Sequence, residues 1–518
     1  MLGCFSFTCL LYALLGKFTI LIWFPFLYIG SIQLVGNYRL GVRFSSSVIG
    51  EILHASESEI SSFLTTYNIA GLIILFFFTL ILCWWQHAVL KKHNRFHTAS
   101  IGCLSLILFY FLLAFIPNNE RISPPHRHKL HILPFPVQET IHVSKSGFDG
   151  SSQDVKLLMR VDNLISPAKA PSSSPVVKDN SGIVCILHIG ESVSAERLVF
   201  NGYHRNTTPW LSKQKNLISF PRCVSLYHIT TTAIIGLLSD GDRQEASRET
   251  FDLINPRLGN VADLFSKHGF YTAMLVGHNA IEQKRASTKY TFGEAMQSFT
   301  RNMNNLLESP GKPHLQAEQA LALCREHEKQ NCFLILNNEG SHGPFSCYDT
   351  EHPTFTPSDH TSFYSAPQGA DEGMNNAFDN TLVYTDDYIR KLLEGLKGRP
   401  YIYIYISDHG EFLGNDGLYG RTWIFAHSTP EEGIRQYRQR HEALVGMFII
   451  PSDEWIALHP HFAQVAGQLR KNRQMTICQG HLFDTLLGMF GIQTEHYQPQ
   501  WDLSSPEVKP YSGTQPAP

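Results

Sequence analysis

The sequence predicts an α/β fold, a mostly parallel sheet flanked by helices, preceded by an α-helical transmembrane domain. From residue 182 onward, short apolar runs typical of buried strands alternate with segments of helical periodicity. Before that, residues 1–116 are strongly apolar, whereas the rest of the 518-residue chain has the composition of a soluble domain. We therefore expect a transmembrane helical domain at 1–117, a Pro/Ser-rich linker at 118–180 and a globular domain at 181–518.

Three uncharged stretches approach the ~20 residues that cross a bilayer as a helix. They are Phe18–Val35, Ile69–Trp85 and Ala99–Ile116, with Leu2–Leu15 as a weaker fourth, so we expect three or four spans. Lys91, Lys92 and Arg95 place the loop between the last two spans in the cytoplasm, although Arg39 and Arg43 favour the opposite orientation. On the denser basic loop, everything after residue 117 is expected outside the cytoplasm.

Charge and cysteine content limit the partners and the compartment. The formal net charge is −3, so no overall field favours nucleic acid as a partner. An exported domain lies in an oxidising compartment, where disulfides form. Cys324 and Cys332 are the exported pair closest in sequence and the expected bridge, whereas Cys185 lies within a predicted strand and is expected to be free.

Strands and helices alternate along the globular domain. The predicted strands are Ile183–Ile189, Phe270–Val276, Cys332–Asn338, Tyr401–Ile406 and Leu444–Ile450, and the predicted helices are Val261–His268, Leu382–Leu396 and His481–Phe490. Alternation of this kind is typical of a parallel sheet with helices on both faces.

Two of these strands end in metal-ligating side chains. Tyr401–Ile406 leads into Ser407-Asp408-His409, and the first strand leads into Gly190-Glu191-Ser192. In an open α/β sheet, ligands bind at the carboxyl ends of the strands. Glu191, Asp408 and His409 are therefore predicted to hold a divalent cation with one position open for chemistry. The alternative is that these residues only cap a helix and line a surface turn.

A hydroxyl nucleophile is expected at the start of a further helix. Thr230, Thr231 and Thr232 precede an apolar run with helical character, and Thr is a good N-cap. A hydroxyl at a helix N-terminus beside a divalent cation is placed to attack phosphorus. Ser192 is the other hydroxyl candidate, and a plain helix cap is the alternative interpretation.

Two histidines are candidates for charge stabilisation. His342 follows the predicted strand Cys332–Asn338 and shares its edge of the sheet with the predicted metal ligands. His427 lies in the loop after Asp408 and has the same expected role with less support.

The order of short motifs along the chain resembles the bacterial phosphoethanolamine transferases of the alkaline phosphatase/sulfatase superfamily. The motifs are Gly190-Glu191-Ser192, Asn201-Gly202-Tyr203, Thr207-Thr208-Pro209, His342-Gly343-Pro344, Asp379-Asn380-Thr381, Tyr384-Thr385-Asp386, Ser407-Asp408-His409-Gly410-Glu411 and Phe483-Asp484-Thr485-Leu486-Leu487-Gly488. The resemblance runs from the apolar region almost to the end of the chain, and it implies an alkaline-phosphatase/sulfatase-like fold for the globular domain. The family usually has five membrane helices, more than the three or four counted here.

The resemblance implies a zinc ion held by Glu191, Thr230, Asp408 and His409. Zinc is preferred over calcium or magnesium because His409 offers a nitrogen ligand, and Mn²⁺ is also compatible. Thr230 is then the nucleophile, because the family has an Ala three residues later, as Ala233 is here. The choice among the three threonines stays open, since the flanking residues depart from the Cys-Gly-Thr common in lipid A enzymes.

The resemblance also implies residues that contact the substrate. His342 matches the family's histidine near the substrate phosphate. His427 matches the second such histidine if a short insertion is allowed, whereas Arg421 occupies the simple spacing. Asn279 and Lys284 are the expected further substrate contacts.

The function implied is a zinc-dependent phosphoethanolamine transferase in the bacterial inner membrane, multi-pass, with its catalytic domain in the periplasm. The donor is phosphatidylethanolamine, and the acceptor is lipopolysaccharide, at lipid A or a core sugar, or another periplasmic glycan. Transfer runs through a phosphothreonine intermediate. The alternatives are a phosphoglycerol transferase of the same fold and a non-catalytic membrane sensor. A sulfatase is disfavoured, because no Cys/Ser-x-Pro-x-Arg run occurs near residues 225–240.

Overall fold

The chain divides into two compact units, which we describe separately. One unit comprises Met1–Gln153, Thr361–Gly369 and Thr422–Gly433, and the other comprises Asp154–His360, Ala370–Arg421 and Ile434–Pro518. The structure, a computed structural model, describes residues 181–227, 230–241, 243, 260–277, 303–308, 313–338, 340–343, 345, 352–358, 372–413 and 435–516, with residue 176 and scattered positions between 9 and 98.

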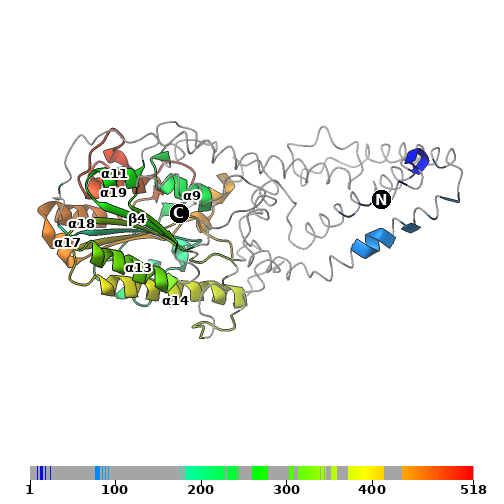
Figure 1. Ribbon diagram of the computed structural model, residues 1–518, viewed down its shortest axis with the longest axis horizontal. Coiled ribbons are helices and arrows are strands. Elements are labelled where there is room, and N and C mark those ends of the chain that lie inside the picture. The colour runs from blue at the N-terminus through cyan, green and yellow to red at the C-terminus, as the bar shows by residue number, and fades with distance from the viewer. Residues whose placement is uncertain are drawn as a thin grey trace. The chain divides into compact units, whose positions relative to one another are not determined.

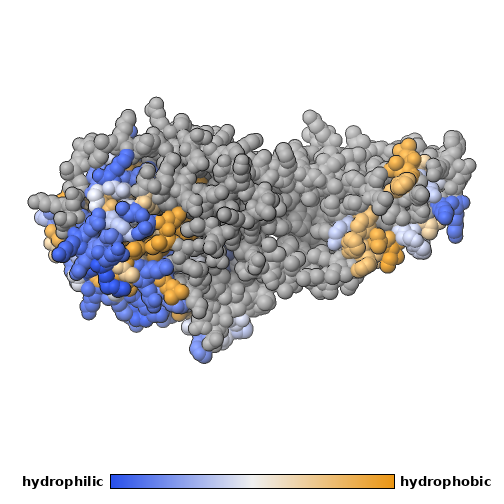
Figure 2. Space-filling model, in the orientation of Figure 1, coloured by the Kyte–Doolittle hydropathy of each residue, from blue (hydrophilic) through white to orange (hydrophobic). Residues whose placement is uncertain are grey.

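The expected transmembrane spans lie mostly outside these residues. Within the described part of the chain, no helix combines the length and the apolar character needed to cross a bilayer. Its exposed large hydrophobic residues are Leu14, Phe18, Phe76, Phe77, Phe78, Leu80, Ile81, Trp84, Trp85, Leu315 and Leu458. Most belong to residues 76–85, where Figure 2 shows a hydrophobic group. Exposed apolar surface of this density is typical of a segment that contacts lipid or protein.

A seven-stranded mixed sheet forms the centre of the larger unit, in the order β2-β8-β7-β1-β6-β4-β5. The strands are β1 (Val184–Gly190), β2 (Ile218–Ser219), β3 (Cys223–Val224), β4 (Tyr271–Val276), β5 (Asn305–Glu308), β6 (Cys332–Asn337), β7 (Tyr401–Ser407), β8 (Met447–Pro451) and β9 (Ile477–Cys478). The neighbours from β7 through β1, β6 and β4 to β5 run parallel, whereas β8 is antiparallel to both β7 and β2. Separately, β3 pairs with β9 in parallel.

Helices cover both faces of the sheet. They are α9 (Thr230–Leu237), α11 (Val261–Lys267), α13 (Pro313–Glu326), α14 (Glu372–Gly395), α17 (Asp453–Leu458), α18 (Pro460–Asn472) and α19 (His481–Met489). Short 3₁₀ helices lie at Ala195–Arg197, Val199–Asn201, Leu211–Lys213, His441–Ala443 and Pro499–Trp501. Figure 1 shows α11 and α19 over one face and α13 and α14 over the other, the layered arrangement predicted from the sequence.

Each predicted strand is present, and so are the three predicted helices. Two differences have physical reasons. The last predicted strand begins at Met447 and runs antiparallel, a direction that an apolar run does not encode. The sequence analysis missed α13 and α18, although both begin with a proline in the first turn, where its fixed φ suits a helix.

The predicted disulfide between Cys324 and Cys332 is wrong in this structure. Both are free buried thiols, one in α13 and the other at the start of β6. Burial raises the pKa of Cys324 to about 12 and that of Cys332 to about 11, so both remain protonated at neutral pH. Cys185, within β1, is free as predicted.

His188 is a fully buried imidazole on the α14 side of β1. Its Nδ1 contacts the Tyr403 hydroxyl, and its Nε2 lies 3.0 Å from Nδ2 of Asn338. Tyr388 and Tyr405 pack their rings edge-on against it. Because Asn338 Nδ2 can only donate, Nε2 is the accepting nitrogen, and Nδ1 carries the proton. Burial lowers the pKa of His188 to about 3, so the imidazole is neutral at physiological pH.

This imidazole should make the folding stability depend on pH. The folded-state pKa of about 3 lies below the ordinary 6.5, so between these values the unfolded chain binds a proton that the folded chain does not. The stabilisation is complete above pH 6.5 and is lost as pH falls, by up to about 1.4 kcal/mol per unit. When the pH falls from 7 to 5, the free energy of unfolding of the native protein should therefore decrease by about 2 kcal/mol more than that of His188→Gln. Urea unfolding at several pH values measures this, and equal losses would contradict it.

Candidate functional site

Glu191, Asp408 and His409 meet at the carboxyl edge of the sheet. The pairing of β1 with β7 places Gly190 opposite Ser407, so the next residues of both strands are neighbours. Each of the three offers a ligand atom within 4.8 Å of the others, and all three are buried. The structure thus brings together the three side chains that the sequence analysis expected to converge.

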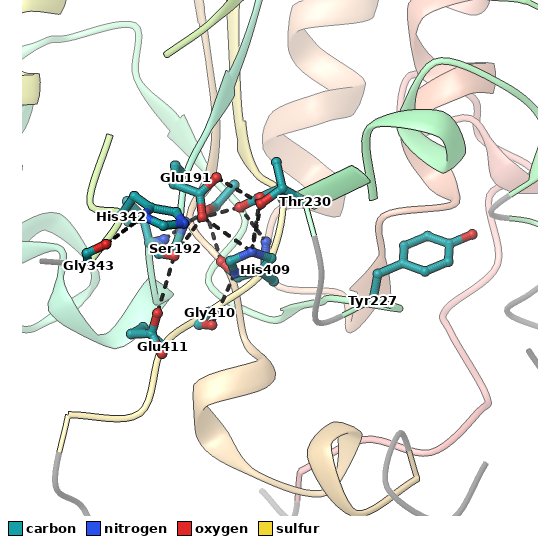
Figure 3. A network of polar contacts seen from close by, with 12 residues as sticks. Glu191, Ser192, Tyr227, Thr230, His342, Gly343, His409, Gly410 and Glu411 are labelled. Carbon is teal, nitrogen blue, oxygen red and sulfur yellow. Dashed lines mark hydrogen bonds and ion pairs between the residues drawn. The ribbon is translucent and has the colours of Figure 1, made fainter. Parts of the chain in front are cut away.

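Thr230 adds a hydroxyl to this cluster (Figure 3). Its Oγ1 donates to Oε2 of Glu191 at 2.9 Å and lies 3.2 Å from Nε2 of His409. The same His409 nitrogen is 3.3 Å from Oε1 of Glu191 and 3.1 Å from Oδ2 of Asp408. Two carboxylates, one imidazole nitrogen and one hydroxyl therefore surround a common point.

The start of α9 positions the Thr230 hydroxyl. Thr230 is the first residue of the helix, and it is anchored because Ala233, Ile234 and Ile235 are buried. The unpaired N–H groups of a helix start carry partial positive charge, which favours an anionic oxygen or a phosphate there. The side chains of Thr231 and Thr232 lie outside the described residues.

Ser192 and His409 fix the orientation of the carboxylates and the imidazole. Ser192 adopts a φ of 61°, unusual for a residue with a side chain. In this conformation its N–H donates to Oδ1 of Asp408 at 3.0 Å, and its hydroxyl donates to Oε1 of Glu191 at 2.8 Å. Nδ1 of His409 lies 3.2 Å from the Gly410 carbonyl and donates to it, so Nε2 carries the lone pair that faces the carboxylates.

The loop that carries His342 packs directly against Glu191. The Ser341 N–H donates to the Glu191 carbonyl at 3.1 Å. Gly340 has a φ of +45°, and a Cβ there would lie 2.9 Å from the Glu191 nitrogen, so only glycine fits. Nδ1 of His342 donates to the Gly343 carbonyl at 2.6 Å, which fixes the orientation of the ring.

The buried charges of the site suit a divalent cation. Glu191, Asp408 and Glu411 are all buried, and Ser192 Oγ contacts both Glu191 and, at 3.4 Å, Glu411. Carboxylates gathered in a low-dielectric interior repel one another unless protons or a cation offset their charge. Two oxygen ligands, one nitrogen ligand and an adjacent hydroxyl match a catalytic zinc or manganese site.

The remaining predicted site residues are not among those described. His427, Asn279 and Lys284 all fall outside the described part of the chain. The sequence analysis also missed residues that support the site. Ser225 and Gln479 bond to the backbone behind the ligands, and no local pattern marks them, because Gln479 lies 71 residues from Asp408.

Zinc should change the effect of Glu191→Gln on stability from neutral or favourable to unfavourable. Without a cation, Glu191→Gln removes one of the repelling charges, so the variant should unfold at the same temperature as the native protein or higher in chelator. With zinc at a hundred times its Kd, the native protein should gain about 2.7 kcal/mol and the variant little. Thermal unfolding in chelator and in zinc measures both. The same change at Glu326, an exposed carboxylate in α13, is the control and should leave the zinc response intact. An unaltered zinc response in Glu191→Gln would contradict the assignment.

Comparison with known proteins agrees with the fold. The sequence model of the Sulfatase family matches residues 184–492. The phosphoethanolamine transferase EptA of Salmonella typhimurium is 24% identical over 484 residues, covering 90% of this chain and 81% of the relative. The Kdo(2)-lipid A phosphoethanolamine 7''-transferase of Escherichia coli is 24% identical over 345 residues, and the match covers 64% of this chain and only 55% of that relative.

Two solved structures share the fold. The integral membrane protein lipooligosaccharide phosphoethanolamine transferase A of Neisseria meningitidis superposes with a TM-score of 0.63 at 17% identity, covering 98% of this chain and 90% of that one. The periplasmic domain of EcEptC from Escherichia coli, in complex with Zn, gives 0.50 at 18% identity over 67% of this chain and 91% of that one. The family match spans more than half of the chain and includes Glu191, Thr230, Asp408 and His409. The chain belongs to the Sulfatase family.

Proposed function

We propose that this protein is a membrane-anchored, metal-dependent phosphoethanolamine transferase. It moves phosphoethanolamine from phosphatidylethanolamine to lipopolysaccharide, at lipid A or a core sugar, or to another periplasmic glycan. The names of the relatives support the reaction class. The observation that carries the proposal is the Thr230 hydroxyl, which lies 2.9 Å from a Glu191 oxygen inside a buried set of metal ligands.

The first step transfers the headgroup to the protein. Thr230 Oγ1 attacks the phosphorus of the donor while its proton passes to the Glu191 carboxylate that it contacts. A Thr–O–P bond forms, the bond from phosphorus to the glycerol oxygen breaks, and diacylglycerol leaves after taking a proton from a histidine. Phosphoethanolamine is then bound covalently to Thr230.

The second step releases the headgroup to the acceptor. An acceptor hydroxyl loses its proton to the same histidine and attacks the phosphorus. The Thr–O–P bond breaks, and Thr230 regains a proton from Glu191. His342 is the described candidate for this acid–base role, because it is an imidazole on the loop that packs against Glu191 through the Ser341 N–H.

Glu191, Asp408, His409 and Thr230 would hold the cation, which we propose to be Zn²⁺, with Mn²⁺ compatible. When bound, it supplies charge neutralisation for the phosphoryl oxygens and lowers the pKa of the hydroxyl. We further propose His427 as a second histidine at the phosphate, and Asn279 and Lys284 as substrate contacts.

We propose the bacterial inner membrane as the location, with several spans and the catalytic unit in the periplasm. The apolar runs at the start of the chain support this, and so does the exposed hydrophobic surface around residues 76–85. A lipid donor also favours an enzyme held at the bilayer.

Labelled donors test the reaction class. The purified protein should become labelled by phosphatidylethanolamine carrying a labelled headgroup, and not by the matching phosphatidylglycerol. Thr230→Ala should lose the label and at least about a thousandfold in transfer rate, whereas Thr230→Ser, which keeps a hydroxyl, should retain part of both. Labelling by phosphatidylglycerol alone would point to a phosphoglycerol transferase, and labelling by neither to a non-catalytic protein. Mass spectrometry of lipopolysaccharide and glycans from cells with and without the protein identifies the acceptor.

His342 should affect turnover and leave metal binding unchanged. We expect His342→Gln to lower kcat by about 100-fold, because proton transfer to the leaving oxygen is impaired. Zinc content should equal that of the native protein, since His342 is not among the clustered ligands. A variant with native kcat would remove His342 from the mechanism, and one without zinc would make it a ligand.

A further inference from the structure

We propose that Gln479 is a positioning residue that locks the nucleophile segment to the metal-ligand turn. It lies between β9 and α19 in the last part of the chain, and it is 1% exposed. The inference rests on the proposed metal-dependent transfer. It assigns a role to a side chain whose hydrogen bonds go to the backbone of Leu226, Ser407 and Asp408, and not to the metal-binding atoms or to Thr230.

The Gln479 carboxamide joins two segments that are far apart in sequence. Its Nε2 donates to the Ser407 carbonyl at 3.0 Å and to the Asp408 carbonyl at 2.6 Å. Its Oε1 accepts from the Leu226 N–H at 2.8 Å. One side of the amide therefore holds the backbone of the ligand Asp408, and the other holds the strand segment that leads into Thr230.

Ser225 completes the link. Its hydroxyl lies 2.7 Å from the Tyr227 carbonyl, 3.0 Å from the Asp408 carbonyl and 3.1 Å from Oε1 of Gln479, so its one proton is shared among these acceptors. With the Leu226 N–H on the oxygen and two carbonyls on the nitrogen, both amide protons and one position of the oxygen are occupied, and the Ser225 hydroxyl lies beside that oxygen. A buried amide that makes hydrogen bonds from both its nitrogen and its oxygen is held in one geometry.

The orientation of the amide follows from its partners. The Leu226 N–H can only donate, and the Ser407 and Asp408 carbonyls can only accept. If the amide were reversed, its NH₂ group would face the Leu226 N–H, and its oxygen would face the two carbonyl oxygens. A carboxylate in this place would likewise set an oxygen against two carbonyl oxygens. The site therefore needs a neutral carboxamide, which also adds no charge beside the metal ligands.

This link bears on chemistry because both segments carry reacting groups. Leu226 precedes Thr230 by four residues, and Asp408 and His409 are ligands themselves. Thr230 lies only 3.2 Å from Nε2 of His409, so a small shift of one segment against the other disturbs the nucleophile and the ligand set together. Groups that orient ligands from behind typically account for about 10- to 100-fold in metal affinity or activity.

The test compares two buried carboxamides. Gln479→Met keeps the approximate size and removes the hydrogen bonds. Asn472→Leu is the matched control, because Asn472 is also buried and bridges the Leu503 and Ser505 carbonyls in the same unit. We expect Gln479→Met to bind zinc about 10- to 100-fold more weakly in a chelator competition and to lower kcat with little change in KM. Asn472→Leu should lose stability but keep native zinc affinity. Equal zinc affinity in the two variants would overturn the proposal.

A milder variant covers the case in which Gln479→Met does not fold. Ser225→Ala removes the hydroxyl that contacts the Asp408 carbonyl and Oε1 of Gln479, and we expect it to weaken zinc binding by about 3- to 10-fold. Native affinity in Ser225→Ala would then overturn the proposal. If the native protein itself binds neither zinc nor manganese, the proposed function fails. If it binds zinc and the variants bind it equally well, only the role of Gln479 fails.

Discussion

The parallel pairing of β1 with β7 is the constraint on which the site depends. It places Gly190 opposite Ser407, so Glu191 and Asp408, the next residues of the two strands, lie at the same edge of the sheet. The Asp408 N–H then donates to the Gly190 carbonyl, and the Ser192 N–H donates back to the Asp408 side chain. A shift of one residue in this register would turn the side chains of the shifted strand to the opposite face of the sheet and separate Glu191 from Asp408.

Burial of those ligands has an electrostatic cost that explains the chemistry. Glu191 and Asp408 are fully buried, and Nε2 of His409 lies 3.3 Å and 3.1 Å from their carboxylate oxygens. A divalent cation offsets both charges and lowers the pKa of a neighbouring hydroxyl at once. The arrangement that costs stability without a cation is therefore the one on which the proposed role of Thr230 depends.

The sequence was sufficient where a local pattern carried the information. Apolar runs identified β1, β4, β6 and β7, and the polar residues that follow them identified Glu191, Asp408, His409 and His342. The pattern does not encode strand direction, so the antiparallel course of β8 was not foreseen. It also carries no sign of long-range polar contacts. Ser225 and Gln479 are ordinary residues in the sequence, and only the pairing of β3 with β9 brings them together.

The pairing of β3 with β9 also bears on how the protein matures. The segment before Thr230 meets its partners some 254 residues later in the chain, and the end of the chain folds back to place Tyr511 beside Tyr227. Contacts of such long sequence separation form late in folding. During synthesis Thr230, the proposed nucleophile, is therefore joined to these partners only after the segment that carries β9 has emerged.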